Sequence, residues 1–91
     1  MLFEWNEKKA TQNLIKHGVS FEEASTAFQD DMSLTISDPL HSEFEDRFIL
    51  LGYSKNDRLI VVVHTDRQNR IRIISARLAT KRERRQYEKG K

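Results

Sequence analysis

The 91-residue sequence contains no cysteine, one proline and three glycines. Without cysteine the chain has no disulfide, no thiolate metal site and no cysteine nucleophile, which suits a reducing compartment. With so little proline and glycine it has no linker or low-complexity tract, so residues 1–91 are expected to form one domain. The longest apolar run, Leu59 to Val63, is far too short to span a bilayer, and the N-terminal residues do not resemble a signal peptide. We therefore expect a cytoplasmic protein without a membrane segment.

Charge is divided unevenly along the chain. Residues 1–46 carry three basic side chains against ten acidic ones, whereas residues 47–91 carry thirteen basic against four acidic. Nine of the thirteen are arginines, whose planar guanidinium can hold phosphate through two parallel hydrogen bonds. A basic half on a small domain favours a polyanionic partner, most simply a nucleic acid, over a merely solvated surface.

Helix signals occur near both ends of the chain. Asn6 can cap a helix that ends at Gly18, a residue suited to the left-handed stop. Two further helices are opened by capping boxes, in which a hydroxyl and a glutamate three residues later satisfy backbone N–H groups. The pairs are Ser20 with Glu23, and Thr80 with Glu83 before a basic helix that runs to about residue 89.

Alternating apolar and polar residues predict strands between the second and third helices. The expected strands are 32–36, 48–53, 59–65 and 70–76, and residues 2–5 suit a short additional strand. The predicted fold class is therefore α+β, with two N-terminal helices, an antiparallel sheet of about four strands plus a short N-terminal strand, and a C-terminal basic helix.

The last predicted strand mixes arginines with apolar residues. Alternation would place Arg70, Arg72, Ile74 and Ala76 on one face, and Ile71, Ile73, Ser75 and Arg77 on the other. We expect helices to cover one side of the sheet and an open, concave basic face on the other. Arg77, at the strand end, either contributes to that face or ties the strand to the basic helix through backbone carbonyls.

Several segments together resemble the BrnT family of toxins. They are Phe3-Glu4-Trp5 with Lys8 and Lys9, Lys16-His17-Gly18-Val19-Ser20-Phe21-Glu22-Glu23-Ala24, Glu45 with Arg47, Gly52, Ile73-Ile74-Ser75-Ala76-Arg77, and Ala79 to Glu88. The Lys-His-Gly and Ile-Ser-Ala-Arg segments are the most specific, and Asn6 stands where the family often carries Asp.

This resemblance implies a RelE-like fold and a ribonuclease toxin of a bacterial type II toxin–antitoxin pair. It also implies a BrnA-like antitoxin that covers the toxin and, with it, represses their own operon. Operator DNA is then expected as a partner only through the antitoxin complex.

RNA cleavage without a metal sets clear chemical requirements. The ribose 2′-OH attacks the adjacent phosphate, which needs a proton acceptor, positive donors for the charged phosphorane and an acid for the leaving oxygen. Arginine serves only as the positive donor, because it stays protonated. The candidates for that role are Arg47, Arg72, Arg77 and Arg84, and the surrounding candidates for binding nucleic acid are Lys16, Arg70, Lys81, Arg82 and Arg85.

The proton-transfer groups must come from a small remaining set, which is His17, His41, His64, Glu45, Lys16 and Tyr87. Of these, His17, Glu45 and Tyr87 are retained as catalytic candidates beside the arginines. Each has a plainer interpretation: His17 as a helix-end cation, Glu45 as a surface ion pair with Arg47, and Tyr87 as a packing residue. His64 in its apolar strand is more often a core residue.

The leading hypothesis is an endoribonuclease toxin that acts on RNA and arrests translation and growth. The alternative is a non-catalytic nucleic-acid-binding module that uses the same basic face. No cluster of His, Asp and Glu has ligand spacing, so we expect neither metal nor cofactor. A weaker idea is that the acidic half docks a basic segment of the antitoxin.

Overall fold

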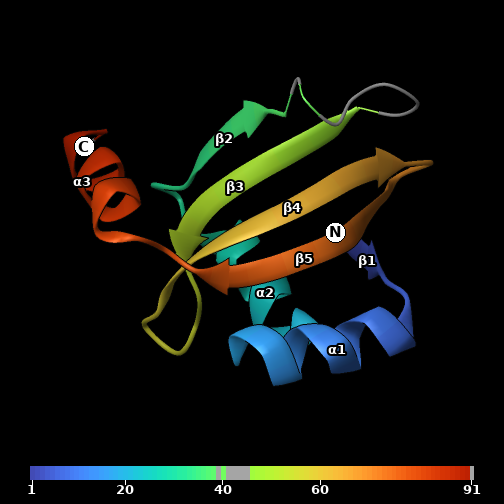
Figure 1. Cartoon of the computed structure of the whole chain (residues 1–91). Coiled ribbons are helices and arrows are strands. Elements are labelled where there is room, and N and C mark those ends of the chain that lie inside the picture. Colours follow the sequence, from blue (N-terminus) through green and yellow to red (C-terminus); the bar gives the residue numbers. More distant parts are fainter. Residues whose placement is uncertain (39, 41–45, 91) are drawn as a thin grey trace.

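The computed structural model describes residues 1–38, 40 and 46–90, so the candidates His41 and Glu45 lie outside the described residues. Figure 1 shows one sheet with helices on one side and a further helix at one end. The elements are β1 (Leu2–Glu4), α1 (Glu7–His17), α2 (Phe21–Thr26), the short 3₁₀ helix η1 (Ala27–Gln29), β2 (Leu34–Ser37), β3 (Arg47–Tyr53), β4 (Leu59–Arg67), β5 (Arg70–Leu78) and α3 (Lys81–Lys89). The predicted α+β class is confirmed.

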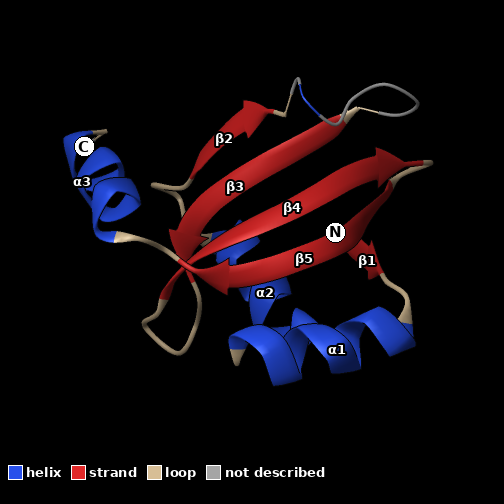
Figure 2. Cartoon of the chain, in the orientation of Figure 1, coloured by secondary structure: helices blue, strands red, loops and turns tan. Residues whose placement is uncertain are grey.

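The sheet is mixed, with the strand order β1-β5-β4-β3-β2. Strands β2 to β5 form the predicted antiparallel meander, and β1 adds to its edge in parallel with the start of β5. The β4–β5 turn has positive φ at Gln68 and Asn69, the pair of left-handed residues that a tight hairpin needs. The chain thus begins beside the strand that carries Arg70, Arg72 and Arg77 (Figure 2).

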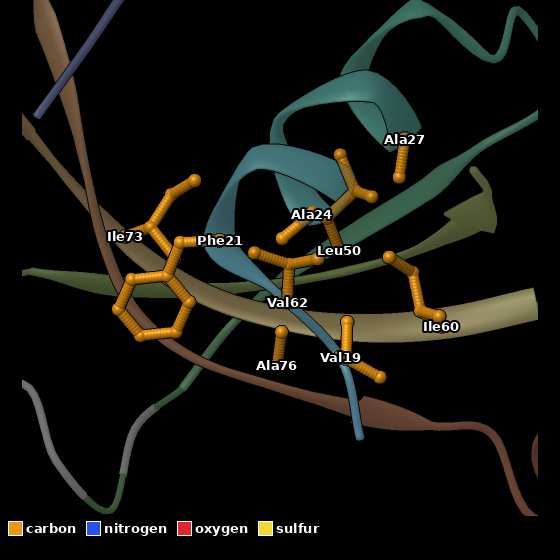
Figure 3. Close-up of a cluster of buried hydrophobic side chains, with 9 residues drawn as sticks. All are labelled: Val19, Phe21, Ala24, Ala27, Leu50, Ile60, Val62, Ile73 and Ala76. Atoms are coloured by element: carbon orange, nitrogen blue, oxygen red, sulfur yellow. The ribbon is translucent and has the colours of Figure 1, made fainter. Parts of the chain in front are cut away.

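One face of the sheet is covered by α1 and α2, and the main core lies between them. The segment from residue 19 to 27 supplies four fully buried side chains, which pack on residues of β3, β4 and β5 (Figure 3). The cluster consists of Val19, Phe21, Ala24, Ala27, Leu50, Ile60, Val62, Ile73 and Ala76. Burying this apolar surface is the main contribution to the stability of the domain.

The helix boundaries follow the signals in the sequence. Asn6 accepts a hydrogen bond from Lys9 N–H, and Gly18 ends α1 with φ 70°. Ser20 caps α2 as predicted, but the carboxylate of Glu23 does not close the box. It accepts hydrogen bonds from Arg58 and from the Ser54 hydroxyl instead, in a site where Glu23 is 5% exposed. The bonds from Arg58 lower the pKa of Glu23, so this buried carboxylate is anionic and paired.

A side-chain amide continues the edge of the sheet where β1 stops. β1 pairs with β5 only as far as Arg72, which leaves the outer edge of β5 uncovered near Ala76. The buried Asn13 of α1 donates to the carbonyls of Ala76 (2.8 Å) and Val19 (2.9 Å) and accepts from Ala76 N–H (3.1 Å). Asn13 therefore holds α1 on the sheet and satisfies backbone groups that the interior would otherwise leave unpaired.

Replacing this amide tests its contribution. We expect Asn13→Ala to lower the free energy of unfolding by about 3 kcal/mol, because buried N–H and C=O groups lose their partners. The measurement is urea unfolding followed by circular dichroism, with Gln12→Ala on the exposed side of α1 as the control. Equal stabilities of the two variants would contradict the role assigned to Asn13.

Candidate active site

One extra residue in β5 decides which arginines share a face. Val63 pairs with Ser75, but the next residue of β4, His64, pairs with Ile73, so Ile74 is an additional residue on the β5 side. Such a bulge reverses the alternation of side chains beyond it. The sequence-based assignment of Arg72 and Arg77 to opposite faces was therefore wrong, because it assumed unbroken alternation.

The face without α1 and α2 carries rows of side chains that lie opposite one another across the strands. In order from the α3 end, the rows are Leu34, Leu51, Val61 and Arg77; then Ile36, Ile49, Val63 and Ser75; and last Arg47, Thr65, Arg72 and Glu4. We call this surface the open face. Its centre is apolar and its arginines lie along β5 and at the far row, so the expected open basic face has basic residues around an apolar centre.

A groove occupies the apolar part of the open face. It has a volume of about 480 Å³ and is bounded at one end by α3. Its floor is aliphatic, and its polar lining comes from Ser75 and Arg77 of β5 and from Glu83 and Gln86 of α3. A polar site on β5 and an apolar groove thus lie side by side.

Arg72 lies in the far row beside Thr65 and Arg47. Its guanidinium donates to the Glu4 carboxylate at 3.1 Å, and the two side chains are 30% and 27% exposed. The Thr65 side chain between the two arginines is buried, and its hydroxyl has no hydrogen-bond partner in the described part of the chain. Arg72 is therefore accessible, with most of its N–H donors available to an anion.

Arg77 connects β5 to α3 through a bidentate ion pair. Both of its terminal nitrogens donate to the Glu83 carboxylate at 2.8 Å, and one of them also donates to the carbonyl of Leu78. Glu83 in turn closes the predicted capping box with Thr80. The hydrogen bonds from Arg77 lower the pKa of Glu83 to about 2. The strand-to-helix role considered for Arg77 is thus present, with a side chain instead of backbone carbonyls as the main acceptor.

Arg84 and Tyr87, both on α3, take part in a network of hydrogen bonds and ring contacts with Tyr53 and Asp30. Arg84 donates to the Tyr53 hydroxyl at 2.9 Å, and Tyr53 packs edge to face against Tyr87. The buried Tyr87 donates its phenol to Asp30 at 2.8 Å. Burial, together with this bond to a carboxylate, raises the pKa of Tyr87 to about 12. Tyr87 therefore stays protonated near neutral pH and holds α3 on the sheet, while its catalytic role stays a prediction.

The two described histidines of the candidate set lie away from the open face. His17 is the last residue of α1, in the layer on the other side of the sheet. His64 is 5% exposed and packs between the rings of Phe28 and Phe48. Burial lowers the pKa of His64, so it is neutral near pH 7. The interpretation of His64 as a core residue agrees with this packing.

The predicted nucleic-acid-binding residues are all exposed but do not form one patch. Arg70 begins β5 on the same face as Arg72, whereas Lys16 lies at the end of α1. The remaining three, Lys81, Arg82 and Arg85, are on α3. Among residues 1–38, 40 and 46–90, no three His, Asp or Glu side chains gather as metal ligands. No described helix is both long enough and apolar enough to cross a membrane.

Comparison with known proteins decides the family. The profile described as "Ribonuclease toxin, BrnT, of type II toxin-antitoxin system" matches residues 5–83. The chain belongs to the BrnT family. It is therefore a ribonuclease toxin of a type II toxin–antitoxin system by family, and an antitoxin is its implied partner.

A solved structure agrees in fold. The crystal structure of the Brucella abortus ribonuclease toxin, BrnT, is similar with a TM-score of 0.65 and 20% sequence identity, over 89% of this chain and 100% of that one. A search of the curated proteins gave no match. The RelE-like details and helix arrangement implied by the resemblance stay a prediction.

Sequence reasoning missed three residues of this candidate site. Glu4 and Glu83 pair with the central arginines, and Tyr53 receives Arg84. Glu4 belongs to the quoted Phe-Glu-Trp motif, but its spacing from Arg72 along the chain gave no sign of contact. Tyr53 follows Leu51 at the strand period of two, so its position on the open face was readable from the sequence.

The ion pair between Arg77 and Glu83 has a predictable pH dependence. The pKa of Glu83 in the folded protein, about 2, lies below the ordinary value of 4.5. The stabilisation from the ion pair is therefore complete above about pH 4.5 and is lost as the pH falls toward 2. We expect Glu83→Gln to lower the free energy of unfolding at pH 7 by about 1–2 kcal/mol, a value reduced for partial exposure. The difference from the wild type should shrink when denaturant unfolding is repeated at pH 3.

The matched control is Glu88→Gln, an exposed carboxylate on the same helix. It should change stability little at either pH. A stability gap for Glu83→Gln that is constant from pH 7 to pH 3 would contradict the assigned ion pair.

Proposed function

We propose that this chain is a metal-independent endoribonuclease that cleaves RNA on the open face and thereby inhibits translation and growth. The observation that carries the proposal is the bulge at Ile74, which places Arg72 on the same face as Arg77 and Arg47. Several guanidinium groups on one face can stabilise the extra negative charge of a phosphorane. The family assignment supports the same activity.

The arginines differ in how many donors they have to offer. Arg72 and Arg84 each make one hydrogen bond among the described residues, to Glu4 and to the Tyr53 hydroxyl. Arg77 is committed to Glu83 through both terminal nitrogens. We assign phosphate binding chiefly to Arg72 and Arg84, with Arg77 holding α3 so that Arg84 is in position.

Cleavage in the presence of a chelator tests the proposal. We expect the purified protein to cut RNA in excess EDTA, and Arg72→Ala or Arg84→Ala to lower kcat/KM roughly 100-fold, because a donor to the developing charge is lost. Arg72→Lys should restore part of the activity. The readout is the cleavage of a labelled RNA on a denaturing gel.

The control is Lys8→Ala on α1, in the layer that covers the other face, and it should cleave as the wild type does. Salt-sensitive RNA binding without cleavage in the wild type would instead support the non-catalytic binding module. Activity that disappears with EDTA and returns with a divalent metal would overturn the metal-independent mechanism.

We assign the proton acceptor to Glu45 in preference to His17. His17 lies in the helix layer, whereas Glu45 precedes Arg47 by two residues, a spacing at which strand residues share a face. The support for Glu45 comes from the sequence alone, since it is not among the described residues. His41 is a candidate for the general acid that protonates the leaving oxygen.

The pH–rate profile separates the two candidates. We expect Glu45→Gln to lower kcat roughly 100-fold and to remove the acidic limb of the profile, because a general base is lost. His17→Gln should keep the rate and the shape of the profile. The opposite pattern would transfer the role to His17.

A further inference from the structure

The apolar groove is not explained by RNA cleavage. Among the described residues no aromatic ring lines it on which a base could stack, and six of the lining residues are aliphatic. Ile36, at its β2 end, is 63% exposed, so the apolar surface of the groove extends to solvent there. An apolar surface of this kind beside a polar site is typical of a protein-binding surface.

We propose that this groove binds one amphipathic helix of the antitoxin, with acidic residues along the flanks of its apolar stripe. The inference rests on the toxin role proposed above, because that role supplies the partner. It goes beyond that role by assigning the surface and the chemistry of the segment that fills it.

The paired strands favour a helix over an added strand. β3 and β4 lie inside the sheet and are hydrogen-bonded to a strand on each side, so the part of the floor that they form offers side chains and no free backbone groups. A sheet face without a covering layer is normally completed by a helix that lays its apolar stripe on it. The other face of this sheet is covered in that way by α1 and α2.

The charges around the groove determine which sign of charge the partner segment must carry. Arg77 lies in the groove lining, Arg84 is on the helix that bounds it, and Arg72 is in the row beyond Ser75. Glu83 is paired with Arg77 and Glu4 with Arg72, so Arg84 is the arginine of these three that has no carboxylate partner among the described residues. A helix with acidic flanks is attracted to this rim, whereas a basic segment is repelled. This differs from the idea that the acidic half of the chain docks a basic antitoxin segment.

The position of the groove links partner binding to inhibition. A helix seated on Val61 and Val63 contacts Arg77 and Ser75, which share its lining. Such a helix blocks the approach of RNA to the arginines of β5 sterically. It does not have to occupy the positions at which these arginines bind phosphate. One surface would therefore recognise the antitoxin while the adjacent one binds RNA.

Two exposed isoleucines provide a matched test. Ile36→Glu changes the groove, and Ile15→Glu changes an 81% exposed position on α1. The probe is the labelled antitoxin encoded by the adjacent reading frame, titrated with full-length toxin variants and followed by fluorescence anisotropy. We expect Ile36→Glu to raise Kd at least tenfold and Ile15→Glu to change it less than twofold.

A second variant is needed in case Ile36, at the rim of the groove, contributes little to antitoxin binding. Ser75→Tyr fills the floor of the groove from the uncovered side and should also raise Kd at least tenfold. Circular dichroism and thermal unfolding confirm that each variant is folded. Unchanged affinity in both folded groove variants, or equal losses in Ile36→Glu and Ile15→Glu, would overturn the proposal.

RNA cleavage by the same variants identifies a different occupant. Ile36→Glu should cleave RNA as the wild type does, whereas loss of cleavage with unchanged antitoxin affinity would assign the groove to RNA and overturn the inference. A free dimer that Ile36→Glu converts to a monomer would assign it to a second copy, with the same consequence. If the wild type cleaves no RNA but the affinity pattern is as expected, the proposed function fails and the docking assignment holds.

Discussion

The additional residue in β5 is the constraint on which the open face depends. With regular pairing, Arg72 and Arg77 would lie on opposite sides of the sheet, and one of them would point into the core beneath α1 and α2. The bulge at Ile74 lets Ile73 and Ala76 both face the main core while the arginines before and after it share the other side. A single inserted residue thus serves the core and the site together.

The arginines are held by carboxylates from both halves of the chain. Glu23 binds Arg58 and Glu4 binds Arg72, so the acidic first half positions part of the basic second half. Within the second half, Glu83 binds Arg77. The uneven charge of the sequence is therefore balanced locally in the fold by ion pairs. Arginines that keep N–H donors outside these pairs can be distinguished from arginines with a structural role.

Local signals in the sequence predicted most of the helices and strands. The features that these signals did not predict depend on long-range pairing between strands. Asn6, Gly18 and the Thr80–Glu83 box fixed the helix ends, because caps depend on a few neighbouring residues. The bulge and the parallel pairing of β1 have no local signature, since they depend on how distant strands meet. For the same reason the candidate arginines could be named, but neither their shared face nor the apolar centre between them could be derived.

Three contacts that hold the site join distant parts of the chain. Glu4 and Arg72 are 68 residues apart, Asn13 and Ala76 are 63 apart, and Asp30 and Tyr87 are 57 apart. Each closes a loop of more than half the chain, and the entropy of that closure must be overcome before the contact stabilises anything. Folding of this small domain is therefore expected to be limited by long-range closure instead of by the rapid formation of its helices. The protein gains its open face only when the two ends of the chain have met.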